Sequence, residues 1–352
     1  MLRVTRPFRK KRHAPLHAWR VVAFRIRIPT CSGPFLPSNL SPIQCDLVRG
    51  SISPATSVRP PEIAGLTNLK RMAHTSDKQS MNRPEISVVL PTYNGERFLR
   101  RALDSILDQT FERWELIIVN DASTDSTQEI INNYQSKDPR IRCVRNARNE
   151  KLPASLNIGF SHASGDFLTW TSDDNYYDPE AFAKMLGVLE SNRDIGLVYA
   201  DMAIVSEDEK IIRSKARNYI GKLYSGCCVG ACFMYRADLH DRFGTYDTSL
   251  FCAEDYEFWL RLWTGGVRFH HLKKMLYYYR DNPASLSATK ASQVLKKTFD
   301  VKVVYWDRAP VSAFAKCLSL CKTQRKAKCP LMLEKIYSLH PIMGRVIKFI
   351  KK

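Results

Sequence analysis

The sequence contains no run of 18 apolar residues, so no segment has the length and composition of a membrane-spanning helix. It also lacks the Gly-x-Gly-x-x-Gly and Walker lysine motifs, so neither dinucleotide-binding nor P-loop chemistry is indicated. No Cys-x-x-Cys pair occurs among the ten cysteines, and no secretory signal is evident. We therefore interpret the cysteines as reduced thiols of a cytoplasmic protein.

Positive charge is scarce in the middle of the chain, although the whole sequence carries a formal net charge of +19. Residues 1–71 hold 13 basic and two acidic residues, and residues 290–352 hold 15 and three, whereas residues 72–289 hold 26 and 30. A nucleic-acid-binding domain needs its positive charge on the folded unit itself. The distribution therefore argues against nucleic acid as a partner.

The first 80 residues are rich in Arg, Pro and Ser and show no regular periodicity. We interpret them as a disordered basic extension. An organelle transit peptide is one alternative, because the segment is rich in arginine and poor in acids. A start codon assigned too early is another, since Met72 and Met81 both precede the first predicted strand.

Short apolar runs alternate with segments of helical periodicity from residue 86 onward. This alternation predicts an α/β fold with a mostly parallel sheet flanked by helices. Ligands of such sheets bind at the carboxyl ends of the strands. The predicted strands are 86–90, 115–120, 141–145, 167–171 and 195–200, and the predicted helices are 98–107, 128–134, 154–163 and one that begins at Asp178-Pro179.

Carboxylates follow two of these strands directly. Asp173 and Asp174 are adjacent, so their charges repel, and a magnesium or manganese ion would relieve that repulsion and favour a diphosphate substrate. A solvated turn in which one aspartate caps the next helix explains the pair equally well. Asp121 follows the second strand and fits either a helix cap near Ser123 or an acceptor for the ring N–H of a nucleobase.

A third acidic pair, Glu254-Asp255, opens a predicted helix whose apolar face contains Phe258, Trp259 and Leu262. Acidic residues in a first turn interact favourably with the helix dipole and need no other purpose. A general base that takes a proton from an acceptor hydroxyl is the functional interpretation.

Together, the motifs between residues 86 and 287 resemble the family-2 glycosyltransferases, which have the GT-A fold, a Rossmann-like α/β sheet. Each motif is weak alone, but their order and spacing are specific. The matching stretches are 86–94 (ISVVLPTYN), 118–125 (IVNDASTD), 154–159 (ASLNIG), 163–166 (ASGD), 172–174 (SDD), 253–255 (AED) and 277–280 (YYYR) with Ser285 and Ser287.

The resemblance implies a metal-dependent, inverting glycosyltransferase of the hexosyltransferase type, with Mn²⁺ or Mg²⁺ as cofactor. It would move a sugar from a nucleotide-diphospho-sugar, most simply a UDP-sugar, to the hydroxyl of a glycan or lipid-linked acceptor in cell-surface polysaccharide synthesis. A catalytically silent nucleotide-binding module of the same fold is the alternative.

The resemblance also assigns roles to individual residues. Asp174 would bind the metal, Asp173 would approach the ribose or the metal, and Asp255 would be the catalytic base. The remaining donor-binding positions are Pro91, Thr92, Tyr93 and Asn94 in the nucleotide pocket, Asp121 at the base, and Asn157 with Gly159 in the helix behind the diphosphate.

Two positions depart from the family pattern. The usual Asp-x-Asp is Ser172-Asp173-Asp174 here, and Asp281 stands where many relatives carry a histidine, which leaves the role of Arg280 open.

The chain is therefore predicted to comprise an extension (1–80), a glycosyltransferase domain (81–289) and a basic helical C-terminal extension (290–352). Residues 342–352 predict an amphipathic helix suited to peripheral contact with an anionic membrane, or else a helix packed on the domain with its lysines in water. Its apolar face holds Ile342, Met343, Val346, Ile347 and Ile350, and its basic face holds Arg345, Lys348, Lys351 and Lys352.

Overall fold

A computed structural model describes residues 83–327 of this chain. The extension predicted for residues 1–80, with its transit-peptide and start-codon alternatives, lies outside the described residues. The amphipathic helix predicted for residues 342–352 lies outside them as well.

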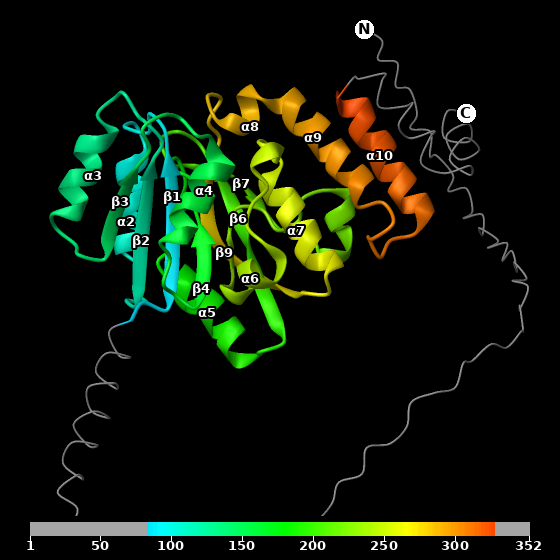
Figure 1. Cartoon of the computed structure of the whole chain (residues 1–352), viewed down its shortest axis with the longest axis horizontal. Coiled ribbons are helices and arrows are strands. Elements are labelled where there is room, and N and C mark those ends of the chain that lie inside the picture. Colours follow the sequence, from blue (N-terminus) through cyan, green and yellow to red (C-terminus); the bar gives the residue numbers. More distant parts are fainter. Residues whose placement is uncertain (1–82, 328–352) are drawn as a thin grey trace, which may run out of the picture. The chain divides into compact units, whose positions relative to one another are not determined.

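Nine strands in the described part form one mixed sheet (Figure 1). They are β1 (Ile86–Thr92), β2 (Trp114–Asn120), β3 (Ile141–Arg145), β4 (Phe167–Trp170), β5 (Tyr176–Tyr177), β6 (Ile195–Val205), β7 (Ile211–Lys215), β8 (Phe233–Arg236) and β9 (Arg268–Arg280). Their order is β3-β2-β1-β4-β8-β6-β9-β5, and β7 pairs with β6 beside this path.

Helices connect and cover the strands. The α-helices are α2 (Leu99–Leu107), α3 (Thr127–Gln135), α4 (Leu152–Ser161), α5 (Ala181–Ser191), α6 (Asp238–Phe243), α7 (Glu254–Thr264), α8 (Leu286–Thr289), α9 (Ala291–Val304) and α10 (Ala313–Ala327), and the 3-10 helices are η1 (Ile220–Ser225) and η2 (Thr248–Leu250).

The first four strands run parallel, as the alternation of apolar runs predicts. All seven residues of β1 and of β2 are buried, which explains why these segments are continuously apolar rather than alternating. Successive side chains point to opposite faces of the sheet. Val89 therefore packs in one core cluster with Leu156 of α4, while Val88 packs in the other with Leu103 of α2.

The other half of the sheet is mixed. Strand β8 is antiparallel to both β4 and β6, whereas β6 and β9 are parallel. The β6–β9 pairing shifts register around Asp201, and the β6–β7 pairing shifts at Ile204/Val205. Such irregularities bend strands and increase their twist locally. They curve this half of the sheet around the start of α7.

Helices α9 and α10 continue the core beyond residue 289. Phe299, Trp306 and Leu320 are buried in the cluster that contains Val89 of β1 and Trp259 of α7. Figure 1 shows α8, α9 and α10 following one another above α7. The boundary predicted at residue 289 thus falls between α8 and α9, and α9 and α10 pack on the same core as the sheet.

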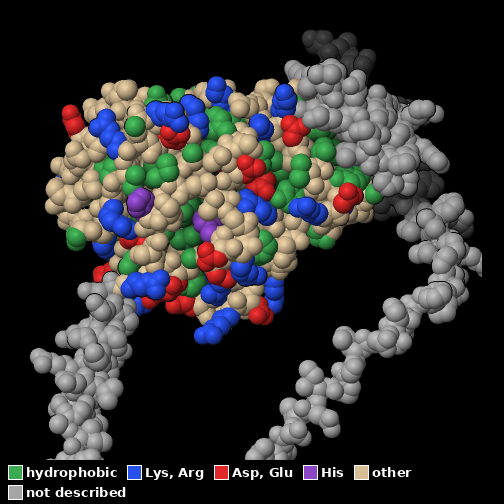
Figure 2. Space-filling model, viewed as in Figure 1, with side chains coloured by type: hydrophobic (Ala, Val, Ile, Leu, Met, Phe, Trp, Pro, Cys, Tyr) green, Lys and Arg blue, Asp and Glu red, His purple; other side chains and the backbone are tan. Residues whose placement is uncertain are grey.

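The described surface mixes both signs of charge. On the face shown in Figure 2, basic and acidic side chains are interspersed over the sheet and its covering helices. Between residues 83 and 327, no helix combines the length and apolar character needed to cross a membrane.

Candidate active site

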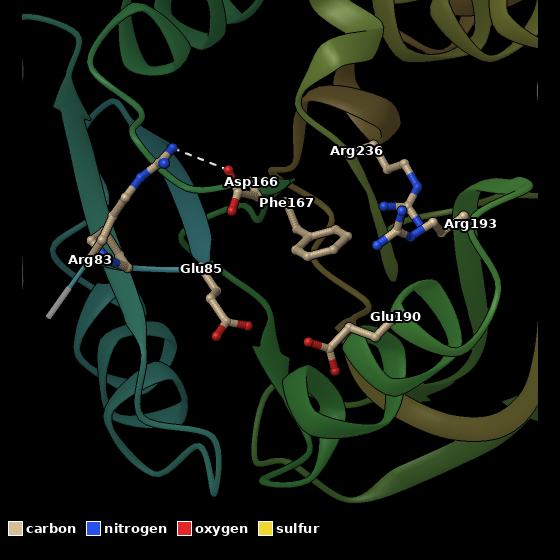
Figure 3. Close-up of a pocket in the computed structure, with 8 residues that line it drawn as sticks. Arg83, Glu85, Asp166, Phe167, Glu190, Arg193 and Arg236 are labelled. Atoms are coloured by element: carbon tan, nitrogen blue, oxygen red, sulfur yellow. Dashed lines mark hydrogen bonds and ion pairs between the residues drawn. The ribbon is translucent and has the colours of Figure 1, made fainter. Parts of the chain in front are cut away.

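The candidate site lies where the parallel strands end. Thr92 and Asn120 are register partners at the carboxyl ends of β1 and β2, and the Thr92 hydroxyl donates to Asp173 Oδ2 over 2.5 Å. Three segments predicted from the sequence therefore meet at one edge. A cavity of about 510 Å³ lies instead at the amino ends of β1 and β4, where Glu85, Asp166 and Arg236 contribute to its lining (Figure 3).

The turn after β1 depends on Gly95, which the sequence reasoning missed. A Cβ atom at this position would lie 2.3 Å from Asp173 Oδ2 and 2.4 Å from Thr92 Oγ1. Just before it, Asn94 has a φ of 54° and is tied to the β2 loop, donating from its N–H to Ser123 and accepting from the N–H of Thr124. The sequence signal was a glycine directly after Asn94, a polar residue that follows the strand, because glycine permits close approach of the backbone to other groups.

The predicted nucleotide-pocket residues occupy different environments. Pro91 is buried within β1, opposite Val119 of β2, so it supports the strand. Tyr93 is 51% exposed at the strand end, which leaves its ring accessible to a ligand.

Asp121 organises the loop after β3. Its carboxylate is buried and accepts hydrogen bonds from Asn146 Nδ2 (2.8 Å) and the N–H groups of Glu150 (2.8 Å) and Lys151 (3.0 Å). A carboxylate offers about four acceptor positions, so one remains for another donor. The cap alternative is wrong, because α3 begins at Thr127 and the Thr127 N–H is bound by Asp125.

Asp173 and Asp174 form the loop between β4 and β5, and neither caps the next helix, since α5 begins after Glu180. Burial and the charges of Asp174 and Asp125 raise the pKa of Asp173 to about 7, although the hydrogen bond from Thr92 lowers it. The pair thus carries an electrostatic cost that a nearby cation would offset.

The donor set at this loop is small. The described residues contain no group of three or more His, Cys, Asp or Glu side chains arranged to hold a metal ion. Two carboxylates nevertheless fit Mg²⁺ or Mn²⁺, because such ions are commonly bound through one or two carboxylates together with substrate phosphates and water. The residues present therefore suit a cation that arrives with a diphosphate.

Arg280, whose role the sequence left open, holds this loop in place. Its side chain is buried, and its Nε donates to the carbonyl oxygen of Asp174 over 3.0 Å. Its Nη2 lies 3.2 Å from Glu209 Oε1, its guanidinium also binds the carbonyl oxygens of Ser206 and Glu207, and its N–H donates to Asn175 Oδ1. Arg280 thereby joins the aspartate loop to the β6–β7 turn.

Glu254 and Asp255 open α7 and have unequal environments. Burial, followed by the charge of Asp255, raises the pKa of Glu254 to about 8, and its Oε2 has no hydrogen-bond partner among residues 83–327. Burial also raises the pKa of Asp255, but the N–H of Tyr256, at 2.6 Å, and the charge of Arg217 lower it. Burial therefore raises the pKa of both carboxyl groups, and only at Asp255 does the charge of an arginine oppose the rise.

Tyr279 on β9 connects the two acidic centres. Burial raises the pKa of its phenol, and the charges of Asp174, Asp255 and Asp281 raise it further. Asp174 and Asp255 therefore both lie within the range at which a charge shifts the pKa of this phenol. The fold thus brings together the proposed metal ligand and the proposed base.

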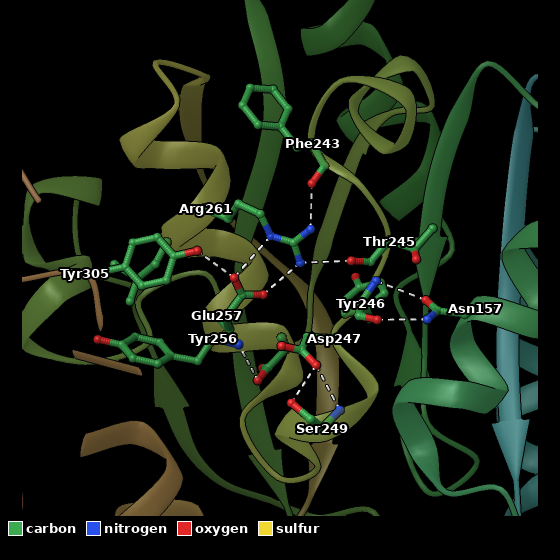
Figure 4. Close-up of polar contacts among 12 residues, drawn as sticks. Asn157, Phe243, Thr245, Tyr246, Asp247, Ser249, Tyr256, Glu257, Arg261 and Tyr305 are labelled. Atoms are coloured by element: carbon green, nitrogen blue, oxygen red, sulfur yellow. Dashed lines mark hydrogen bonds and ion pairs between the residues drawn. The ribbon is translucent and has the colours of Figure 1, made fainter. Parts of the chain in front are cut away.

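Asn157 makes its contacts elsewhere. Its amide donates to the carbonyl oxygen of Tyr246 over 2.8 Å and accepts from the Tyr246 N–H over 3.0 Å (Figure 4). This pairing ties α4 to the loop that leads into α7. A direct role of Asn157 in donor binding stays a prediction.

Helix α7 is also held in place by polar contacts of Glu257. Arg261 forms a two-pronged ion pair with Glu257, and Tyr305 donates to Glu257 Oε1 over 2.6 Å (Figure 4). On α4, Gly159 allows close packing against β1, since a Cβ there would lie 2.4 Å from Val89 Cγ1.

A family model and several relatives are similar to this chain in sequence. A family model described as "Glycosyl transferase family 2" matches residues 87–244. The putative glycosyltransferase EpsE of Bacillus subtilis (strain 168) is 32% identical over 206 residues, which cover 56% of this chain and 74% of that protein. The uncharacterized glycosyltransferase MJ1057 of Methanocaldococcus jannaschii is 31% identical over 209 residues, 57% of this chain and 72% of that protein.

Solved structures share the fold. S. aureus TarS 1–349 in complex with UDP-GlcNAc superposes with a TM-score of 0.56 at 21% identity, covering 68% of this chain and 71% of that one. The mannosyltransferase PcManGT from Pyrobaculum calidifontis, in complex with GDP-Man and Mn²⁺, gives a TM-score of 0.53 at 15% identity and covers 80% and 82% of the two chains.

Proposed function

The chain belongs to glycosyltransferase family 2 and is a glycosyltransferase with the predicted GT-A fold, and from that premise we propose a metal-dependent, inverting transfer. The donor is a nucleotide-diphospho-sugar, with a UDP-sugar as the first choice, and the acceptor is a hydroxyl of a glycan or lipid-linked compound in polysaccharide synthesis. The proposed setting is cytoplasmic, with peripheral membrane contact through residues 342–352.

The donor is proposed to occupy the carboxyl ends of β1, β2 and β4. Tyr93 offers an exposed ring, Asp121 keeps one acceptor position for a base N–H, and Asp173 with Asp174 faces the diphosphate. A divalent cation held by these aspartates would neutralise the departing nucleoside diphosphate. The solved complexes of TarS with UDP-GlcNAc and of PcManGT with GDP-Man and Mn²⁺ support this choice of donor and cofactor.

Asp255 is proposed as the base. Its ionised carboxylate would take the proton of the acceptor hydroxyl while that oxygen attacks the anomeric carbon and the bond to the diphosphate breaks. One displacement inverts the configuration at that carbon. The observation that supports the proposal most is that the charges of Asp174 and Asp255 both raise the pKa of Tyr279, as expected if the proposed metal ligand and the proposed base lie near one side chain.

Thermal unfolding of the full chain with UDP, GDP and their sugar conjugates tests donor binding. Ligand at 100 times its Kd stabilises a protein by about 2.7 kcal/mol. We expect a stabilising nucleotide in the presence of Mn²⁺ and loss of the effect with EDTA. Equal stabilisation with EDTA would contradict metal dependence, and binding without transfer or slow hydrolysis of the sugar nucleotide would favour the silent module.

A further inference from the structure

Three basic residues on and after β7 have no part in the mechanism above. They are Arg213, Lys215 and Arg217, here called the basic strip. Residues 210–237 contain no Asp or Glu, so the acidic contact of the strip comes from β6, where Asp201 Oδ1 accepts from the Arg217 N–H over 2.6 Å. Arg213 and Lys215 are exposed, and neither side chain forms a hydrogen bond or ion pair with any residue between 83 and 327.

Sheet register places the strip on the active-site face. Arg213 is the partner of Ile204 on β6, and Ile204 is the partner of Tyr279 on β9. Residues directly opposite each other on neighbouring strands project from the same face. Arg213 therefore shares its face with Tyr279, the side chain that lies near both Asp174 and Asp255.

Lys215 lies on the same face of the sheet as Arg213, because it is two residues further along β7. It is the partner of Met202, and Met202 is the partner of Tyr277, whose hydroxyl lies 2.6 Å from Thr171 Oγ1 at the end of β4. Partial burial and the charges of Arg217 and Arg213 lower the pKa of Lys215. The three cations are therefore close enough to repel one another, a cost that a bound anion would remove.

Arg217 anchors the strip beside the proposed base. Its Nε donates to the carbonyl oxygen of Cys228 over 2.8 Å, and its Nη2 donates to that of Cys227 over 2.6 Å. Gly230 has a φ of +75°, and a Cβ there would lie 2.8 Å from the Arg217 guanidinium carbon. The guanidinium is thus fixed where its charge acts on Asp255.

We propose that the basic strip binds a phosphate group of the acceptor, so that the acceptor carries phosphate close to the hydroxyl that Asp255 deprotonates. This inference rests on the proposed function, because it takes Asp255 to face the acceptor. The donor diphosphate is the other candidate anion. It belongs with Asp173, whose charged neighbours are the carboxylates of Asp174 and Asp125 rather than the strip.

The phosphate could belong to a soluble compound or to a lipid, so the test uses two probes. The first is glycerol 1-phosphate, compared with glycerol. The second is vesicles of phosphatidylglycerol with phosphatidylcholine, compared with phosphatidylcholine alone. Binding is measured on the full chain saturated with Mn²⁺ and a nucleotide that stabilises it, and nucleotide affinity is measured separately.

The variant is Arg213→Gln/Lys215→Gln, and the matched control is Lys273→Gln/Lys274→Gln, which removes the same charge from exposed positions on β9. The basic segments at the two ends of the chain are unchanged in the variant and the control, so any binding of anions to them is the same in all three proteins. We expect at least one phosphate probe to bind the wild type and to lose affinity about tenfold or more in the strip variant, since hydrogen bonds between charged groups are strong. The control should stay within about twofold, with nucleotide affinity equal throughout.

The possible results of these measurements either support or overturn the inference. Glycerol 1-phosphate binding that is lost in the strip variant identifies a soluble phosphorylated acceptor, whereas a loss seen only with the anionic vesicles identifies a lipid phosphate; both support the inference. Failure of both probes, or an equal loss in the control, overturns it. A parallel loss of nucleotide affinity in the strip variant also overturns it, because the strip then binds the donor diphosphate. Failure of the wild type to bind any nucleotide refutes the proposed function instead.

Discussion

The two halves of the sheet build their parts of the site in different ways. In the parallel half, β1, β2 and β4 end at one edge, so Thr92, Asn120 and Asp173 meet because of strand direction. In the mixed half, β6 to β9 bring Arg217, Asp255 and Tyr279 together through bulges, a left-handed glycine and the packing of α7. Strand direction alone can position a donor site, but the acceptor side needs long-range packing.

Electrostatics differ between the halves as well. The parallel half concentrates carboxylates, and burial together with neighbouring acids raises the pKa of Asp173. The mixed half sets an acidic pair beside a cation: burial raises the pKa of both Glu254 and Asp255, and the charge of Arg217 opposes the rise at Asp255. One half is suited to receive a cation, whereas the other already contains one.

Asp174→Ala tests the parallel half most severely. We expect turnover to fall below detection together with Mn²⁺-dependent nucleotide binding, because the carboxylate proposed to bind the cation directly is then missing. Titration calorimetry with nucleotide, with and without Mn²⁺, measures the effect. Asp166→Ala is the control, since this exposed carboxylate lies at the opposite edge of the sheet (Figure 3). Normal metal-dependent binding in Asp174→Ala would show that Asp174 is only a turn residue.

Asp255→Asn tests the mixed half. The amide is nearly isosteric but cannot accept the proton, so turnover should fall by about 10²–10⁴ while nucleotide affinity stays unchanged. Glu254→Gln should cost less than about tenfold, because the neutral amide resembles the neutral acid that burial favours at this position. The reverse pattern would move the base to Glu254, and two active variants would place it elsewhere.

Gly95→Ala tests the close packing of the turn after β1 in the parallel half. The new Cβ would displace the Asp173 carboxylate and weaken its bond from Thr92, so we expect stability to fall by about 1–2 kcal/mol and metal-dependent nucleotide affinity to fall with it. Gly187→Ala on α5, where no atom lies within 4 Å, should instead stabilise by about 0.5–1 kcal/mol. Denaturant unfolding of both variants checks the contrast, and an equal gain in both would show that the turn has room.

Lys302 offers the smallest effect and concerns the helices that support the mixed half. It is buried, its Nζ donates to Ser319 and Thr323, and burial lowers its pKa to about 8. Between that pKa and the unfolded value of 10.5, the unfolded chain binds the proton and the folded chain does not. Stability should therefore rise with pH in this window, by at most about 1.4 kcal/mol per pH unit.

Lys302→Met removes this titration, so the wild type should gain stability relative to the variant between pH 8 and pH 10. Urea unfolding at several pH values measures the difference. Parallel curves for the two proteins would show that Lys302 keeps its ordinary pKa in the fold.

The parallel half could be predicted from the sequence because its information is local. A continuous apolar run marks a strand buried on both faces, and helical periodicity marks the covering helix, so β1 to β4 and the residues that follow them were expected. The order of these strands then fixes which edge holds Thr92, Asp121 and Asp173. Their chemistry could be proposed from residue types and family motifs alone.

The mixed half escaped this reasoning. The strand predicted to end at residue 200 continues to Val205, and β7, β8 and β9 were not predicted as strands. Strand β7 is exposed along its length, so burial leaves no apolar pattern to detect. Its place in the sheet depends on pairing with β6 rather than on its own composition.

The sequence by itself therefore determined the fold class, the parallel strands and the carboxylates available for chemistry, since periodicity and residue type are local properties. Only the tertiary structure decided how those groups are used. In the folded chain, Asp121 accepts hydrogen bonds from the loop after β3, and Arg280 donates to the carbonyl oxygen of Asp174. Asn157 pairs with Tyr246, and the charge of Arg217 acts on Asp255. Hydrogen bonds and charges act over a few ångströms, and the residues that come this close are far apart along the chain.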